Sequence, residues 1–146
     1  MPETNPFDPQ DMNGAIEALG ANLKSGWQLG LQMAVPEVGS LHQVVICGMG
    51  GSAIGGDFTT AYLAEQLPIP VVAHRNYGLP GWVRGPETLV ICSSHSGNTE
   101  ETLSSFNEAL QRGCSLMSIC TGGKLAGLST ENGKICWIFD HVGQPR

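Results

Sequence analysis

Five short apolar runs, each separated from the next by a stretch with helical features, constrain the fold of this chain most. They lie at 44–47, 70–74, 89–92, 116–120 and 135–139. The runs are apolar on both faces. Such strands, when they alternate with helices, are typical of a parallel sheet that is covered on both sides. The sequence therefore predicts an α/β fold with three layers, built on a doubly wound sheet of five parallel strands.

Helical patterns fill the intervals between these runs. They predict helices over 52 to about 66 and 98 to 112, and a short helix near 125–128. In doubly wound sheets, ligands bind beyond the carboxyl ends of the strands, near the point where the strand order reverses.

The segment before the first run has a character of its own. Residues 1–10 contain three prolines and are expected to form a loose arm. A helix is predicted from Asp11, with Ile16, Leu19 and Leu23 as its apolar stripe, and a second short helix around 27–33. The length of 146 residues fits one domain. We expect residues 1–40 to pack as an arm and helices on a single domain formed by residues 41–146.

A glycine-rich loop follows the first run and reads Gly48-Met49-Gly50-Gly51-Ser52. Glycines let the backbone approach a ligand closely and adopt positive φ angles. A serine at the start of a helix can cap the helix or face an anion. This loop alone does not distinguish a tight strand-to-helix turn from a ligand site.

A second loop follows the third run and places Ser94, Ser96 and Thr99 within six positions ahead of a helix. Hydroxyl groups and the free N–H groups of a first helical turn can bind a phosphate. One helix cap needs one hydroxyl, and this loop offers more than capping requires. The surplus favours an anion site over simple capping.

These loops depart from three known motifs: the dinucleotide fingerprint, the nucleotide P-loop and the nucleophile elbow. A dinucleotide fingerprint would need a third glycine where Ala53 stands, and an acid after the second strand where His74 and Arg75 stand. Arg75 could bind a 2′-phosphate, so an NADP-binding module stays an alternative. A nucleotide P-loop lacks its Lys-Ser/Thr, and a nucleophile elbow would need glycine at Ile54.

Charge and cysteine content restrict the partners. The net charge is −6, which argues against nucleic acid or an anionic membrane as a partner. Five cysteines without a C-x-x-C pair predict free thiols in a reducing cytoplasm. The amino terminus lacks the features of a signal peptide, no run has the length of a membrane span, and no residue cluster has metal-ligand spacing.

The two loops, with Tyr77-Gly78-Leu79-Pro80 between them, resemble the sugar isomerase (SIS) domain, and within it the N-terminal half of bifunctional phosphoglucose/phosphomannose isomerases. The resemblance runs from the first helix to the final Arg146. It implies a flavodoxin-like SIS fold. It also implies the site residues: the hydroxyls of Ser52, Ser94, Ser96 and Thr99 bind phosphate, Gly50 and Gly51 pass under the sugar, and Arg146 stabilises an enediolate.

The same resemblance implies an activity. The full-length enzyme would interconvert glucose 6-phosphate or mannose 6-phosphate and fructose 6-phosphate through a cis-enediol, without a cofactor and as a homodimer. His95 departs from the family, which usually has an aromatic such as Tyr there. The chain stops at Arg146, ahead of the second SIS domain that supplies a glutamate base, a histidine and a lysine. We therefore expect this chain alone to be inactive. A stand-alone regulatory sugar-phosphate sensor is the alternative.

Overall fold

A computed structural model describes residues 7–9 and 11–140. The chain divides into two compact units, Met1–Met33 and Ala34–Arg146. Each unit is described by itself. Among the described residues, no helix is long and apolar enough to cross a membrane.

The first unit contains two helices, α1 (Met12–Glu17) and α2 (Leu19–Gly30). The Asp8 carboxylate accepts hydrogen bonds from the N–H groups of Met12 and Asn13 at the start of α1. These bonds hold the pKa of Asp8 below its usual value. The prediction placed the break between two helices shortly before Trp27. The structure places it at Ala18, whose N–H still bonds back to Gly14, so α2 runs through Trp27 without interruption.

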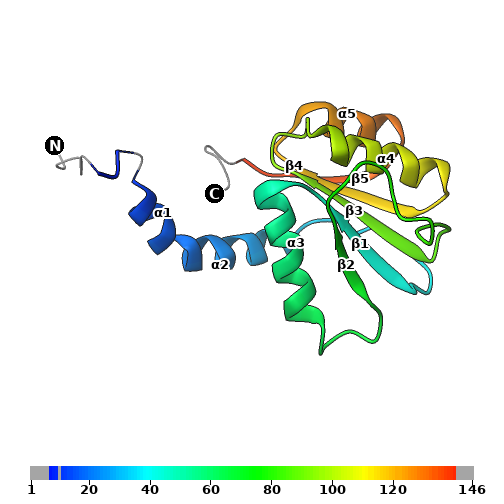
Figure 1. The fold of residues 1–146 in the computed structure, drawn as a ribbon, viewed down its shortest axis with the longest axis horizontal. Helices are drawn as coiled ribbons and strands as arrows, with labels where there is room; N and C mark the ends of the chain where they lie inside the picture. Colours follow the sequence, from blue (N-terminus) through cyan, green and yellow to red (C-terminus); the bar gives the residue numbers. More distant parts are fainter. Residues whose placement is uncertain (1–6, 10, 141–146) are drawn as a thin grey trace. The chain divides into compact units, whose positions relative to one another are not determined.

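The second unit is built on a sheet of five strands, all parallel, in the order β2-β1-β3-β4-β5 (Figure 1). The strands are β1 (Gln43–Cys47), β2 (Val71–His74), β3 (Thr88–Ser94), β4 (Ser115–Cys120) and β5 (Ile135–Ile138). All five coincide with the predicted runs to within two residues. The predicted flavodoxin-like, doubly wound α/β fold is confirmed.

Three helices flank the sheet, α3 (Gly50–Leu63), α4 (Glu100–Gln111) and α5 (Gly123–Glu131). Helices α4 and α5 lie on one face of the sheet and α3 on the other (Figure 1). The main core lies between the strands and α4 and α5. It includes Val45, Val90 and Phe106, each with no exposed surface. Burial of this apolar face is the main driving force for the fold.

Alternation along β3 shows how the two faces differ. Thr88, Val90, Cys92 and Ser94 are buried, while the residues between them are only partly buried. Successive strand residues point to opposite faces. The face toward α4 and α5 is therefore closed along the whole of β3, and the face toward α3 is not.

The cysteines are free thiols in the structure, as predicted. Cys120 and Cys136 approach each other with their sulfurs 3.5 Å apart. Burial raises the pKa of Cys136 to about 12. The thiol is therefore protonated at neutral pH and a poor nucleophile.

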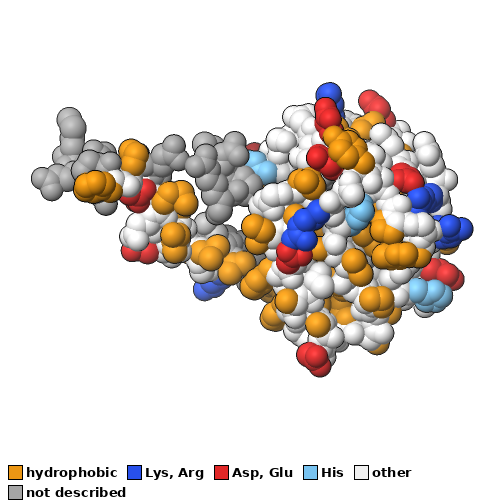
Figure 2. All heavy atoms as spheres, in the orientation of Figure 1, with side chains coloured by type: hydrophobic (Ala, Val, Ile, Leu, Met, Phe, Trp, Pro, Cys, Tyr) orange, Lys and Arg blue, Asp and Glu red, His pale blue; other side chains and the backbone are white. Residues whose placement is uncertain are grey.

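Charged side chains are mixed on the surface. On the face shown in Figure 2, basic and acidic side chains are interspersed, and no extended basic patch is seen there. Proteins that bind nucleic acid typically gather Lys and Arg on one face.

Candidate functional site

The strand order places the two Gly/Ser loops at a topological switch point. From β1 the chain passes through α3 to β2, and from β3 it passes through α4 to β4 on the opposite side. Since β1 and β3 are neighbours, the loops that leave them diverge to opposite faces of the sheet. This divergence opens a crevice at the carboxyl edge, which is where such folds bind ligands.

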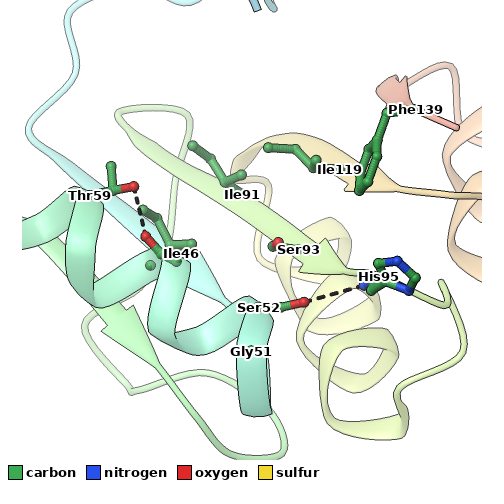
Figure 3. Close-up of a pocket in the computed structure, with 11 residues that line it drawn as sticks. Ile46, Gly51, Ser52, Thr59, Ile91, Ser93, His95, Ile119 and Phe139 are labelled. Carbon is green, nitrogen blue, oxygen red and sulfur yellow. Dashed lines mark hydrogen bonds between the residues drawn. The ribbon is translucent and has the colours of Figure 1, made fainter. Parts of the chain in front are cut away.

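The loop after β1 approaches the backbone of β3 closely. A Cβ atom at the buried Gly48 would lie 2.9 Å from the carbonyl oxygen of Ser93, so only glycine fits there. Helix α3 begins at Gly50, two residues earlier than predicted, and Gly50 has a φ of 53°. Ser52 therefore lies in the first turn of α3. Its hydroxyl accepts a hydrogen bond from the N–H of His95 at 3.3 Å and so connects the two loops (Figure 3).

Ser94 shapes the second loop from within. Strand β3 extends to Ser94, beyond the predicted end at Cys92, and the Ser94 side chain is buried. Its hydroxyl accepts from the N–H of Gly97 at 3.1 Å and lies 2.8 Å from the hydroxyl of Thr99. These contacts fold the loop back on itself and fix the position of Thr99.

Ser96 and Thr99 lie nearer the solvent. Ser96 is exposed, and its hydroxyl accepts from the N–H of Asn98 at 3.2 Å. Thr99 is the N-cap residue of α4, yet its side chain makes no capping hydrogen bond. Capping therefore does not account for this hydroxyl. The first turn of α4 also carries N–H groups that have no partner within a helix, and their dipoles favour an anion.

A third loop, after β4, meets the second one. Thr121 donates to the carbonyl of His95 from both its N–H, at 3.0 Å, and its hydroxyl, at 2.7 Å. The N–H of Leu125 donates to the carbonyl of Gly97 at 2.9 Å. The sequence analysis did not assign this loop to the site. The signal was present as Gly122-Gly123, one residue after the fourth apolar run.

The structure brings most of the predicted site residues to one edge of the sheet. Gly50, Gly51 and Ser52 lie on the loop and first turn after β1, and Ser94, Ser96 and Thr99 lie on the loop after β3. Arg146, the predicted catalytic arginine, lies outside the described residues, and its role stays a prediction.

Several other polar residues near this edge have structural partners. Asp57, on α3, forms an ion pair with Arg75, which follows β2. Arg75 also donates to the carbonyl of Ala53 at 3.4 Å. The His74 ring bonds with the carbonyl of Gly78 at 3.0 Å. The guanidinium that an NADP-binding module would use is thus engaged with a carboxylate.

A hollow of about 460 Å³ lies beside the two loops, on the face of the sheet that carries α3. Its rim near the loops is formed by Gly51, Ser52, Ser93 and His95 (Figure 3). Its floor is apolar, with Ile46, Ile91 and Ile119 on neighbouring strands. Within the described ranges there is no group of three or more His, Cys, Asp or Glu side chains that could hold a metal ion.

Sequence comparison identifies relatives of this chain among known proteins, and two of them carry the same name. No protein-family model matches the chain. It is 40% identical over 120 residues to a bifunctional phosphoglucose/phosphomannose isomerase of Caldicellulosiruptor bescii. The aligned residues make up 82% of this chain and 35% of that protein. It is 43% identical over 98 residues to the protein of the same name from Aquifex aeolicus, and these residues make up 66% of this chain and 30% of that protein. The chain thus spans about a third of the length of these relatives.

Solved structures share the fold. Tagatose-6-phosphate ketose/aldose isomerase from Escherichia coli matches with a TM-score of 0.58 and 20% identity, over 87% of this chain and 35% of that one. Glucosamine-6-phosphate deaminase from Thermotoga maritima matches with a TM-score of 0.56 and 22% identity, over 68% of this chain and 32% of that one. At this level of identity the matches establish the architecture.

Proposed function

Because this chain is an SIS domain that resembles the bifunctional phosphoglucose/phosphomannose isomerases, we propose that it binds the phosphate group of a sugar phosphate in the crevice between β1 and β3. One observation carries the proposal. The two Gly/Ser loops meet at the switch point and are connected through the Ser52 hydroxyl and the His95 N–H. Such a crevice is the usual ligand position in this class of fold.

The local chemistry suits a phosphate. Ser96 and Thr99 present hydroxyls just ahead of α4, and Ser94 holds the loop that carries them. The Ser52 hydroxyl, in the first turn of α3, lies beside the same loop at His95. A phosphate there would receive hydrogen bonds from these hydroxyls and from N–H groups of the first turn of α4. Gly50 and Gly51, which carry no side chains, would let the sugar pass close over the backbone. The negative net charge does not oppose this, since the donors act locally.

The reaction proposed for the whole protein is an aldose–ketose isomerisation. Glucose 6-phosphate or mannose 6-phosphate would lose the C2 proton to a base, form a cis-enediol and regain a proton at C1, giving fructose 6-phosphate. Arg146 would stabilise the negative charge of the enediolate. The base would come from outside this chain, so the chain alone would bind sugar phosphate without turning it over. We also propose that the protein acts as a homodimer in the cytoplasm.

The binding proposal can be tested by calorimetry. Glucose 6-phosphate is titrated into the wild-type chain and into Ser96→Ala and Thr99→Ala. Each substitution removes a hydrogen bond to a charged group, which is worth about 1.5–3 kcal/mol, or roughly a tenfold or greater loss of affinity. Thr130→Ala is the matched control, because Thr130 is exposed and its hydroxyl bonds only within α5, to Ala126.

The outcomes separate the alternatives. Unchanged affinity in both loop variants would refute the assignment of the phosphate site. Binding of NADP without binding of glucose 6-phosphate would favour the dinucleotide alternative. Isomerisation of fructose 6-phosphate at an enzyme-like rate by this chain alone would contradict the proposal that the base lies elsewhere. A reading frame without a second α/β domain would favour the regulatory sensor.

A further inference from the structure

The segment that follows β2 lies along α4 and is hydrogen-bonded to it at three consecutive residues, which we call the strap: Tyr77, Gly78 and Leu79. The three acceptors are four residues apart and so share one side of α4: Glu100, Ser104 and Glu108. The first bond runs from the Tyr77 hydroxyl to the Glu100 carboxylate at 3.1 Å. The other two run from backbone N–H groups of the strap, at 3.0 and 2.6 Å. The strap therefore ends at the first residue of α4.

The middle of the strap is fixed independently of Tyr77. Gly78 has a φ of 67°, which turns the chain there. Its carbonyl accepts from the Ser105 hydroxyl at 2.9 Å and bonds with the His74 ring at 3.0 Å. The Tyr77 side chain thus extends from an anchored backbone. Removing its hydroxyl leaves these backbone contacts in place, so the effect on Glu100 can be separated from any effect on the fold.

Glu100 carries a negative charge next to the proposed phosphate position. It follows Thr99 directly and is the first residue of α4. The first-turn N–H groups have no partner within the helix, and a glutamate side chain in that turn can accept hydrogen bonds from such groups. A phosphate would use the same donors. An unrestrained Glu100 carboxylate would therefore compete with a phosphate for them and repel it.

The bond to Tyr77 restrains this carboxylate on the strap side of α4. Glu100 is exposed and Tyr77 is 56% exposed, so the restraint is a surface contact. The hydrogen bond to Glu100 raises the pKa of Tyr77, and the negative charge of Glu101 raises it further. An ionised phenol beside these carboxylates would be repelled by both. The Tyr77 hydroxyl therefore keeps its proton at neutral pH and remains a donor.

We propose that Tyr77 is a positioning residue of the phosphate site. By holding the Glu100 carboxylate against the strap, it keeps a negative charge off the first-turn N–H groups of α4 and so tightens the binding of a sugar phosphate. The inference rests on the proposed function, because it needs a phosphate at the start of α4. It gives a role in binding to the tyrosine that stands between the two Gly/Ser loops in the sequence.

Calorimetric titration of glucose 6-phosphate into four forms of the full chain tests this role: the wild type, Tyr77→Phe, Glu100→Gln and the double variant. Tyr77→Phe releases the carboxylate and should weaken binding about two- to fivefold, the range of a single charge at a helix amino terminus. The double variant has no carboxylate to release and should bind at least as tightly as the wild type. Glu100→Gln alone should also bind at least as tightly.

Tyr62→Phe is the matched control. Tyr62 is 57% exposed, almost the same as Tyr77, and it lies near the end of α3, away from the strap. Its loss of one phenol hydroxyl should leave the affinity unchanged. A merely structural role of Tyr77 would also lower the affinity in Tyr77→Phe, but replacement of Glu100 would not restore it. Restoration in the double variant is thus the result that identifies a positioning role.

Two results would overturn the inference. One is an unchanged affinity in Tyr77→Phe, and the other is a double variant that binds as weakly as Tyr77→Phe. The Ser96→Ala and Thr99→Ala titrations show which proposal has failed. If these variants lose affinity and Tyr77→Phe does not, the phosphate site stands and only the role of Tyr77 is refuted. If the wild type does not bind glucose 6-phosphate, both proposals are refuted.

Discussion

At the scale of single residues, the site depends on glycines that no other residue can replace. Gly97 has a φ of 66°, and a Cβ atom there would collide with the carbonyl oxygen of Gly122. The second and third loops of the site are therefore in backbone contact. This contact needs a glycine with a left-handed backbone conformation on one loop and a carbonyl group on the other.

Gly97→Ala should destabilise the protein more than the backbone strain alone explains. Gly113 has the same φ of 66° but open space around it. Gly113→Ala therefore measures the strain, about 1–2 kcal/mol, and the excess loss in Gly97→Ala measures the collision. Urea unfolding of the two variants gives both free energies. Equal losses would show that the two loops are not in contact in solution.

At the scale of elements, the connection from β2 to β3 lacks a helix and is held by α4 instead. The Arg112 guanidinium donates to the carbonyls of Leu79, Pro80 and Val83 and pairs with Glu108. Glu108 in turn accepts from the N–H of Leu79 at 2.6 Å. Glu108 on α4 and Arg112 at its C-cap thus replace the hydrogen bonds that a helix would have made within the connection.

Replacing Arg112 should therefore weaken the whole connection. Arg112→Met leaves half-buried carbonyls without donors, and we expect the free energy of unfolding to fall by at least about 1.5–3 kcal/mol. Arg84→Met is the control in the same connection. Arg84 is exposed and donates only to Gly81, three residues away, so its loss should stay within about 0.5 kcal/mol. Similar losses in both variants, measured by urea unfolding, would contradict the role given to Arg112.

At the scale of the whole molecule, the sheet should be most stable at its centre. Strands β1, β3 and β4 each pair on two sides, whereas β2 and β5 are edge strands of four residues. Val45, Val90 and Cys92 have no exposed surface. Local opening requires less free energy at the edges, where fewer contacts are lost.

Amide exchange should follow this order. We expect the slowest amides in β1 and β3 and faster exchange in β2 and β5, as measured by NMR on the intact chain at pH values where exchange is limited by opening. Edge strands that exchange as slowly as β3 would contradict this prediction and would indicate that a further strand or subunit covers an edge.

The sequence by itself determined the strands, their alternation with helices and the two Gly/Ser loops. These features are local, because apolar runs and glycine clusters record the burial and the turn of a few consecutive residues. Their ends were less well predicted. Strand β3 continues through Ser93 and Ser94, polar residues that pair with Ile119 and Cys120, and only the partner strand decides this. The break at Ala18 likewise has no glycine or proline to announce it.

Tertiary structure decided what these elements do together. The order β2-β1-β3-β4-β5 places the two loops side by side at a switch point, and it joins the Gly122-Gly123 loop to them. None of this is encoded in neighbouring residues. Strand order and close loop contacts depend on hydrogen bonds and packing between segments that lie tens of residues apart, and these form only when the whole sheet assembles.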